Sequence, residues 1–426
     1  MTVAESLVGT SAKAAPSRNA KTKGNDMIQT NTRMRTPIPR SEMERRWSLI
    51  RAEMAEAGVD ALISQAANNL TGTAGHYRWV TGLSVASSYL QAVLLPREGL
   101  ATLVMHGDND GVTELDDKEP MFPGIGRRLT SWGFPGCEYC APYEGKLLAK
   151  EIKRAGYKRL GIVAPNTMYS GFTQAFAEEL GHPTYIDLTK RIDIHKATKS
   201  DAEIEMIRNA AAMQDDILEK VKERIKPGGY DYEVMSYGHY LGMLAGSETG
   251  YMLGSSAPFG QPTIIRRAGE HGRRMNEGDT IYFQCENTGP GGMFVHAGRY
   301  YVLGRAPQEL TDMFGAMIDA QDFTAQMLQP GADCREIFAE YNAYMMARGF
   351  PPERRVHCHG QGYDNVEPPL ARSDETMKIG KRMNIGIHPA VGRKDMFITS
   401  CDNFLVDADG KVERLHRTPR EVIELT

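Results

Sequence analysis

Histidine and cysteine, whose side chains bind metal ions or act in catalysis, are unusually frequent in the last third of this 426-residue chain. An imidazole or a thiolate can ligate Zn²⁺ or Fe²⁺, and a thiolate beside an imidazolium is a nucleophile. Nine such residues lie between positions 285 and 426, among them His296, His359, His388, Cys285 and Cys401. Their types allow either metal-assisted or thiol-dependent chemistry.

Cys137 and Cys140 form a CxxC pair. A structural zinc site of this type normally needs a second pair, so we interpret the two as incidental loop cysteines. Six cysteines in a chain of this length are too few for a disulfide scaffold, and reduced thiols are expected.

The composition is that of an ordinary globular protein, with 54 acidic and 50 basic residues, a net charge of −4 and 41% hydrophobic residues. The nearly balanced charge offers no general attraction for phosphate backbones or anionic lipid, so we expect neither nucleic-acid nor membrane binding. No window approaches 18 consecutive apolar residues, and the N-terminus lacks the pattern of a signal peptide. These features predict a cytoplasmic protein.

The elements that must position the reactive side chains begin with an N-terminal α/β domain, expected over residues 39–195. Residues 1–38, rich in small and polar residues without an apolar period, are expected to form a flexible arm. Beyond them helical and strand periods alternate. Helices are expected at 42–57, 145–155 and 171–180, and strands at 60–63, 89–95, 100–105, 159–163 and 185–188.

Residues 196–426 are predicted to form a second domain of α+β class. A long helix is expected from Glu203 to about Lys226, where Pro227-Gly-Gly ends it, and strands then predominate, as in a large, curved, mostly antiparallel sheet. Strands are expected at 249–254, 279–286, 294–303, 382–389, 397–406 and 411–416, and further helices at 231–245, 307–328 and 333–347.

Five segments of the second domain, in this order and spacing, resemble the creatinase/prolidase/methionine aminopeptidase superfamily. They are 199–210, 277–283, His359-Gly-Gln-Gly with Glu367-Pro-Pro, 383–389 and 401–410. The resemblance covers about residues 38–416. It implies a creatinase/prolidase-type N-terminal domain, as in aminopeptidase P and creatinase, followed by a pita-bread catalytic domain, and it implies a homodimer.

The metal-ligand positions of this superfamily are substituted here. Its metallopeptidases hold two ions with Asp, Asp, His, Glu and Glu, and the resemblance places Cys285, His296, His359, His388 and Cys401 at those positions. The loss of four carboxylates should abolish a dinuclear site, whereas imidazoles and a thiolate suit one Zn²⁺ or Fe²⁺. The resemblance therefore implies one divalent transition-metal ion, with His296, His359 and His388 as ligands and Cys401 as the fourth, and Cys285 outside this set.

A metal-free site is the main alternative to this centre. Creatinase, a member of the superfamily, cleaves a C–N bond without metal by means of a histidine, and here Gly260 or Gln261 stands where that histidine is expected. A thiolate nucleophile, Cys285 or Cys401, is a further alternative. Some relatives are lyases and some are non-catalytic interaction proteins, and both interpretations stay open.

Two positions near His359 bear on catalysis. Val366 stands where the metallopeptidases carry a second histidine, so ordinary Xaa-Pro peptidase activity is not expected. Glu367 could act as general acid and base, or could belong to a surface turn. His357 shares a strand face with His359 and could support it.

Five further residues are candidates for substrate binding. Arg266 and Arg267 could clamp a carboxylate or form a solvated edge. His76, Tyr77 and Trp79 lie where relatives place a segment that reaches a neighbouring active site; they could stack on a substrate or belong to the core.

These interpretations together predict a hydrolase that cleaves a C–N bond, of amide, amidino or peptide-like type, in a small polar molecule. His359, Glu367 and Cys285 are its candidate catalytic residues.

Overall fold

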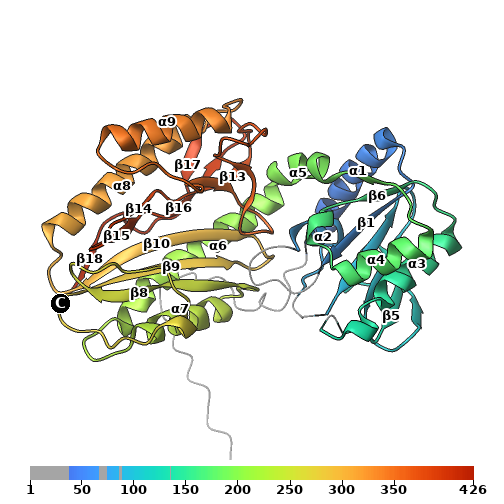
Figure 1. Ribbon diagram of the computed structural model, residues 1–426, viewed down its shortest axis with the longest axis horizontal. Helices are drawn as coiled ribbons and strands as arrows, with labels where there is room; N and C mark the ends of the chain where they lie inside the picture. Colours follow the sequence, from blue (N-terminus) through green and yellow to red (C-terminus); the bar gives the residue numbers. More distant parts are fainter. Residues whose placement is uncertain (1–37, 67–73, 86–88, 135) are drawn as a thin grey trace, which may run out of the picture.

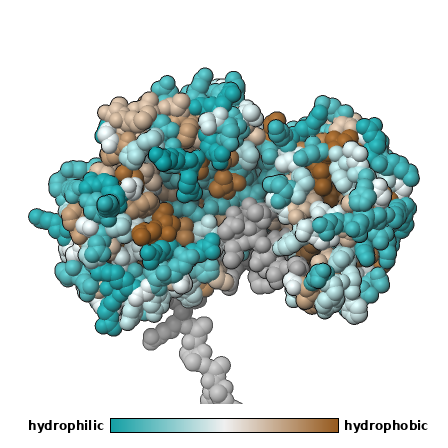
Figure 2. Space-filling view, viewed as in Figure 1, coloured by the Kyte–Doolittle hydropathy of each residue, from teal (hydrophilic) through white to brown (hydrophobic). Residues whose placement is uncertain are grey.

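The computed structural model describes residues 38–66, 74–85, 89–134 and 136–426, in two domains (Figure 1). Of the predicted N-terminal arm, only Ile38 lies within these ranges. No helix in the described ranges is long and apolar enough to cross a membrane. The face shown in Figure 2 is mostly hydrophilic, with apolar side chains in separate patches.

The N-terminal domain is built on a sheet whose described strands follow the order β4-β5-β3-β2-β1-β6-β7. All six residues of β1 are buried, as expected for a central strand covered on both faces. Its side chains alternate between two cores: Leu62 packs toward α1, and Ile63 toward α3 and α4. The elements are α1 (Arg40–Ala57), β1 (Ala61–Ala66), α2 (Gly75–Thr81), β2 (Gln91–Pro96), β3 (Ala101–His106), β4 (Gly111–Glu114), β5 (Ile125–Ser131), α3 (Tyr143–Ala155), β6 (Leu160–Ile162), α4 (Ser170–Leu180), β7 (Tyr185–Asp187) and α5 (Thr189–Ala197).

The second domain has two larger sheets, with strand orders β18-β10-β9-β8 and β12-β11-β13-β16-β17. They join where Gly298 of β10 forms a bridge with Cys401, just before β16. Helices α6 and α7 cover the first sheet, and α8 and α9 pack against the second. The strands are β8 (Gly250–Pro258), β9 (Asp279–Thr288), β10 (Phe294–Leu303), β11 (Cys358–Gly360), β12 (Glu367–Leu370), β13 (Met383–Ile387), β14 (Ala390–Gly392), β15 (Phe397–Thr399), β16 (Asp402–Val406), β17 (Val412–Arg414) and β18 (Ile423–Leu425), and the helices are α6 (Asp201–Lys220), α7 (Asp231–Leu244), α8 (Gln308–Met327) and α9 (Cys334–Ala347).

The predicted α+β class and the antiparallel character of the second domain are confirmed. Helix α6 and the strand predicted over 397–406 differ from the sequence prediction, and several short elements, among them α2, α5, β4, β5 and β11, were not predicted. Helix α6 starts at a capping box between Ser200 and Glu203, and it ends at Lys220 before a short 3₁₀ turn. The strand predicted over 397–406 is two strands, because the chain leaves its pairing with β14 and joins β13. The expected domain boundary between residues 195 and 196 falls inside α5.

Candidate active site

Three neighbouring strands place Tyr251, Glu286 and His296 side by side. Tyr251 of β8 opposes Glu286 of β9, and Glu286 opposes His296 of β10. Directly opposed residues of antiparallel strands point to the same face of a sheet. Helices α6 and α7 cover one face of this sheet, and Cys285 points to that face. The row of Tyr251, Glu286 and His296 therefore lies on the opposite face.

His296 belongs to a cluster of three imidazoles, of which those of His296 and His359 are buried and that of His388 is half-buried. Its ring centroid lies 5.4 Å from that of His359 and 5.4 Å from that of His388, which are 5.1 Å from each other. The rings come from β10, from β11 and from the residue after β13. Gly386 makes room for them, since a Cβ built there would lie 2.2 Å from Nε2 of His296.

The three imidazoles are neutral at neutral pH. Burial lowers the pKa of His296 well below its ordinary value, the pKa of His359 to about 4 and that of His388 to about 3. Nδ1 of His359 lies 2.9 Å from the carbonyl oxygen of Gly360, which can only accept, so Nδ1 carries the proton and Nε2 keeps its lone pair. Nε2 of His296 is buried and has no hydrogen-bond partner among the described residues.

Glu286 supplies a half-buried carboxyl group beside this cluster. Its two oxygens accept hydrogen bonds from Nε2 of Gln284 at 2.5 Å and Nδ2 of Asn365 at 2.9 Å. Burial nevertheless raises its pKa above the ordinary value. The sequence prediction did not include Glu286, because the family ligand position falls on its neighbour, Cys285. The signal that could have found it is the period of two along the strand, which puts residues 284 and 286 on one face.

The geometry supports the predicted four-ligand metal centre only in part. The ring spacing is close to that of imidazoles sharing one tetrahedral ion, roughly 5 Å between centroids for nitrogens about 2 Å from zinc. Ligation, however, requires the donor atoms to aim at one point. Among the residues that the structure describes, no three His, Cys, Asp or Glu side chains form a group that could hold a metal ion. Burial raises the pKa of the free Cys401 thiol well above its ordinary value.

Cys285 lies away from the site. It packs in the apolar core with Met213 and Ile217 of α6, on the sheet face opposite Glu286. Burial raises the pKa of its thiol well above the ordinary value. A neutral thiol under a helix does not reach the imidazoles, so this placement argues against the predicted nucleophile.

Glu367 is buried between two lysines rather than exposed in a turn. Its carboxylate oxygens lie 3.3 Å from Nζ of Lys196 and 3.1 Å from Nζ of Lys199. Burial opposes its ionisation, but the two ammonium groups outweigh burial and hold its pKa at about 2. A carboxylate this acidic is a poor proton carrier near neutral pH, so its placement favours a structural role.

The three residues of the N-terminal domain that were predicted to bind substrate contact other residues of that domain. Tyr77 and Trp79 are buried in the core, where the hydroxyl of Tyr77 donates to Gln91 at 2.7 Å. Nε2 of His76 lies 2.7 Å from Oδ1 of Asp193. These placements support the core interpretation of the two aromatic residues.

The arginine close to the imidazoles is Arg355, not the predicted Arg266 or Arg267. Arg266 and Arg267 are exposed, and Arg267 lies over the ring of Tyr251 at 5.2 Å. Arg355, which the sequence prediction passed over, is exposed and makes no ion pair with the described residues, and its charge helps to lower the pKa of His359 and of His388. It is thus a free guanidinium close to the imidazoles.

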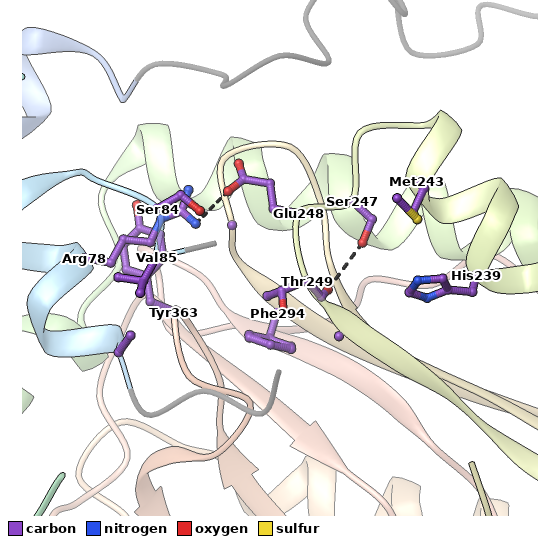
Figure 3. A pocket seen from close by; sticks show the side chains of 13 residues that line it. Arg78, Ser84, Val85, His239, Met243, Ser247, Glu248, Thr249, Phe294 and Tyr363 are labelled. Carbon is purple, nitrogen blue, oxygen red and sulfur yellow. Dashed lines mark hydrogen bonds and ion pairs between the residues drawn. The ribbon is translucent and has the colours of Figure 1, made fainter. Parts of the chain in front are cut away.

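A cavity of about 230 Å³ lies between the two domains. Figure 3 shows Arg78 and Tyr363 on one side of it, His239 on the other and Phe294 between them. Phe294 precedes His296 by two residues on β10, so both side chains point to the same face about 7 Å apart along the strand. The cavity thus reaches β10 at Phe294, but none of the three clustered histidines lines it.

Known proteins resemble the chain over most of its length. Residues 205–408 match metallopeptidase family M24. Ectoine hydrolase of Halomonas elongata is 24% identical, with 91% of this chain and 98% of that protein covered. A probable dipeptidase, PepE, of Mycobacterium tuberculosis is 23% identical, with coverages of 89% and 96%. The prolidase structure from Thermococcus sibiricus has a TM-score of 0.73 at 18% identity, covering 90% of this chain and 99% of that one.

Proposed function

Because the chain belongs to the creatinase/prolidase superfamily and carries a metallopeptidase family M24 domain, we propose that it is a hydrolase cleaving a C–N bond of a small polar substrate. The pair Glu286 and His296 on opposed strands, with two more imidazoles beside it, is the observation that carries the proposal. A half-buried carboxyl of raised pKa among neutral imidazoles is typical of a site that moves protons.

Glu286 is the general base and then the general acid of the proposed reaction. Its raised pKa brings it closer to the working pH, as proton transfer requires. The carboxylate takes a proton from a water molecule, whose oxygen bonds to the carbon of the C–N group. The C–N bond then breaks, and the proton passes from Glu286 to the leaving nitrogen, which returns the carboxylate to its first state.

The neutral imidazoles hold the substrate in this proposal. The lone pair on Nε2 of His359 accepts a substrate N–H group. His296, in the tautomer protonated at Nε2, donates to the oxygen on which negative charge develops, since this atom has no hydrogen-bond partner in the described chain. Both interactions need neutral rings, as burial provides.

The substrate proposed here carries a carboxylate beside its amide or amidine group. Arg355 supports this choice, because a guanidinium with no ion pair in the described chain binds a carboxylate through two hydrogen bonds. Ectoine, the substrate in the name of one relative, is a cyclic amidine with such a carboxylate, and dipeptides are another candidate class. The substituted position Val366 favours ectoine-like compounds over Xaa-Pro peptides.

Turnover of a defined panel tests this function. Purified protein is incubated with ectoine, with N-acetylated diamino acids and with Xaa-Pro and other dipeptides, and products are followed by mass spectrometry. We expect turnover of a carboxylate-bearing amide or amidine, and a loss of at least about 100-fold in kcat for Glu286→Gln, the size typical of a lost general base. Full activity of Glu286→Gln would contradict the proposed role of this residue.

The metal ion, the oligomeric state, the cellular location and the lyase alternative stay predictions from the sequence. A single Zn²⁺ or Fe²⁺ at His296, His359 and His388 is supported by the ring spacing and by the unpartnered Nε2 of His296, but the reaction above uses no ion because the donor atoms do not converge. The homodimer, the cytoplasmic location and the lyase alternative are likewise predictions.

A further inference from the structure

Tyr363, in the segment between β11 and β12, is held by two arginines of the N-terminal domain. The guanidinium carbons of Arg46 and Arg78 lie 5.2 Å and 5.1 Å from the centroid of its ring. Nη2 of Arg46 also donates to the Tyr363 hydroxyl at 3.0 Å. Cation–π contacts between buried groups are worth more than exposed ones, so this clamp is a strong interdomain contact.

Both arginines are themselves fixed. Arg46 is fully buried and donates to Glu42 at 2.6 Å and to Glu203 of α6 at 2.9 Å. Arg78 donates to Glu248 at 2.7 Å and to the carbonyl oxygen of Gly291 at 2.9 Å. Figure 3 shows Arg78 reaching from the N-terminal domain to Glu248, beside Tyr363. The clamp therefore ties α1 and α2 to the catalytic domain.

The residue after Tyr363 is anchored in the same way. Oδ1 of Asp364 accepts the backbone N–H of Gly75 at 2.9 Å, and Oδ2 lies 3.3 Å from Nζ of Lys196. The next residue along the chain is Asn365, which donates to Glu286 at 2.9 Å. Two consecutive residues held by the N-terminal half thus precede the residue that contacts the proposed catalytic carboxyl.

The orientation of Asn365 is fixed by a chain of side-chain amides. Asn403 accepts the backbone N–H of His296 at 2.8 Å and donates to Gln361 at 2.7 Å. Gln361 in turn donates to Oδ1 of Asn365 at 2.8 Å, which leaves Nδ2 of Asn365 to face Glu286. Because each amide oxygen is used, none can flip without losing a buried hydrogen bond.

We infer that the N-terminal domain positions the general acid and base: Arg46 and Arg78 hold Tyr363 so that Asn365 stays hydrogen-bonded to Glu286. Tyr363 and Asn365 are positioning residues in this arrangement, since neither touches the reacting atoms. The inference rests on the proposed function for the role of Glu286, whereas the clamp itself does not.

Hydrogen exchange tests the clamp without any substrate. Deuterium uptake of residues 361–367 is measured by mass spectrometry in the wild-type protein, in Tyr363→Leu and in Arg78→Met, a second variant that removes one guanidinium and keeps the ring. We expect exchange in this segment to be at least about tenfold faster in both variants, because the anchored amides open more often. Unchanged exchange in folded Tyr363→Leu and Arg78→Met would overturn the inference.

Two control variants separate the clamp from general damage. Tyr363→Phe keeps the ring between the arginines and should stay within about twofold of the wild type. Tyr237→Leu removes another ring that faces an arginine, Arg224 at 4.7 Å, within one domain, and should leave residues 361–367 unchanged. Equal acceleration in Tyr237→Leu would mean that the effect is not specific to the clamp.

Kinetics of Tyr363→Leu, Asn365→Ala and their double variant test the positioning role on whichever panel substrate the wild-type protein hydrolyses. We expect kcat to fall at least about tenfold with KM nearly unchanged, and the double variant to be no slower than Asn365→Ala, because one residue acts through the other. Multiplied losses in the double variant would overturn the positioning role. A fully active Glu286→Gln would instead refute the role of Glu286 in the proposed function, and the exchange experiment would still decide on the clamp.

Discussion

Glu286 and His296 lie directly opposite each other on β9 and β10, ten residues apart in the chain, and point to the same side of the sheet. The register of this pair, rather than a local motif, brings a carboxyl group to the imidazoles. The tight Gly289–Gly292 turn between the strands sets that register, since a slip by one residue would turn His296 toward the helices.

The buried imidazoles should make the protein sensitive to acid. His359 and His388 have folded-state pKa values of about 4 and 3, below the roughly 6.5 of an unfolded histidine. Between these values the unfolded chain binds more protons, so the free energy of unfolding falls as the pH drops below about 6.5. His388→Asn should flatten this dependence by up to about 1.4 kcal/mol per pH unit, as urea unfolding at pH 7, 6 and 5 would show. Equal slopes in both proteins would contradict neutral, buried imidazoles.

The ion pairs of Glu367 should contribute stability that is lost only at low pH. Its folded-state pKa of about 2 lies below the ordinary value of 4.5, so its contribution is present above about pH 4.5 and is lost as the pH falls toward 2. Glu367→Gln should destabilise the protein by about 3 kcal/mol at pH 7, because two buried lysines lose their partner. Chemical denaturation measures this; a loss of activity without a loss of stability would instead restore the catalytic interpretation of Glu367.

Most of the fold could be predicted from the sequence because its long elements carry clear periods. Helix α9 and strand β10, for instance, lie within one residue of their expected bounds. Short strands such as β11 could not be predicted, since three residues carry no period and their pairing with β12 and β13 is decided by tertiary contacts.

The candidate site could be predicted only in part. The sequence brought His296, His359 and His388 together through the family resemblance, and the structure places their rings within 5.4 Å of one another. The sequence prediction placed Cys285 near the imidazoles, but neighbouring residues of a strand point to opposite faces, and the side chain that faces the imidazoles is that of Glu286. The roles of Arg78 and Asn365 depend on contacts between segments more than 75 residues apart, which one sequence does not show.

Metal removal should leave the hydrolase active. Among the described residues, no three His, Cys, Asp or Glu side chains form a group that could hold a metal ion. We therefore expect dialysis against a chelator to change turnover by less than about twofold, and metal analysis of protein purified without added metal to give far less than one ion per chain. One equivalent of zinc or iron, with activity lost on chelation and restored by that metal, would establish the mononuclear centre predicted from the sequence.

Removal of the Cys285 thiol should not affect catalysis. The side chain packs under α6, away from Glu286, so Cys285→Ala removes only apolar contacts. We expect kcat within about twofold of the wild type and a loss of about 1 kcal/mol in stability, typical of a small buried truncation. Inactivation by an alkylating reagent in the wild type, absent in Cys285→Ala, would restore the thiol mechanism.

A methyl group at Gly386 should disturb the imidazole cluster. The Cβ of Gly386→Ala would lie 2.2 Å from Nε2 of His296, so the His296 ring must shift from its place in the cluster. We expect at least about a tenfold loss of kcat and a destabilisation of about 1–3 kcal/mol from overpacking. Gly315→Ala is the matched control, because that glycine lies in α8 with open space around its Cβ position, and the substitution should raise stability by about 0.5–1 kcal/mol. Since both variants add one methyl group to the same domain, a normal kcat in Gly386→Ala would show that the position of the His296 ring does not matter for the reaction.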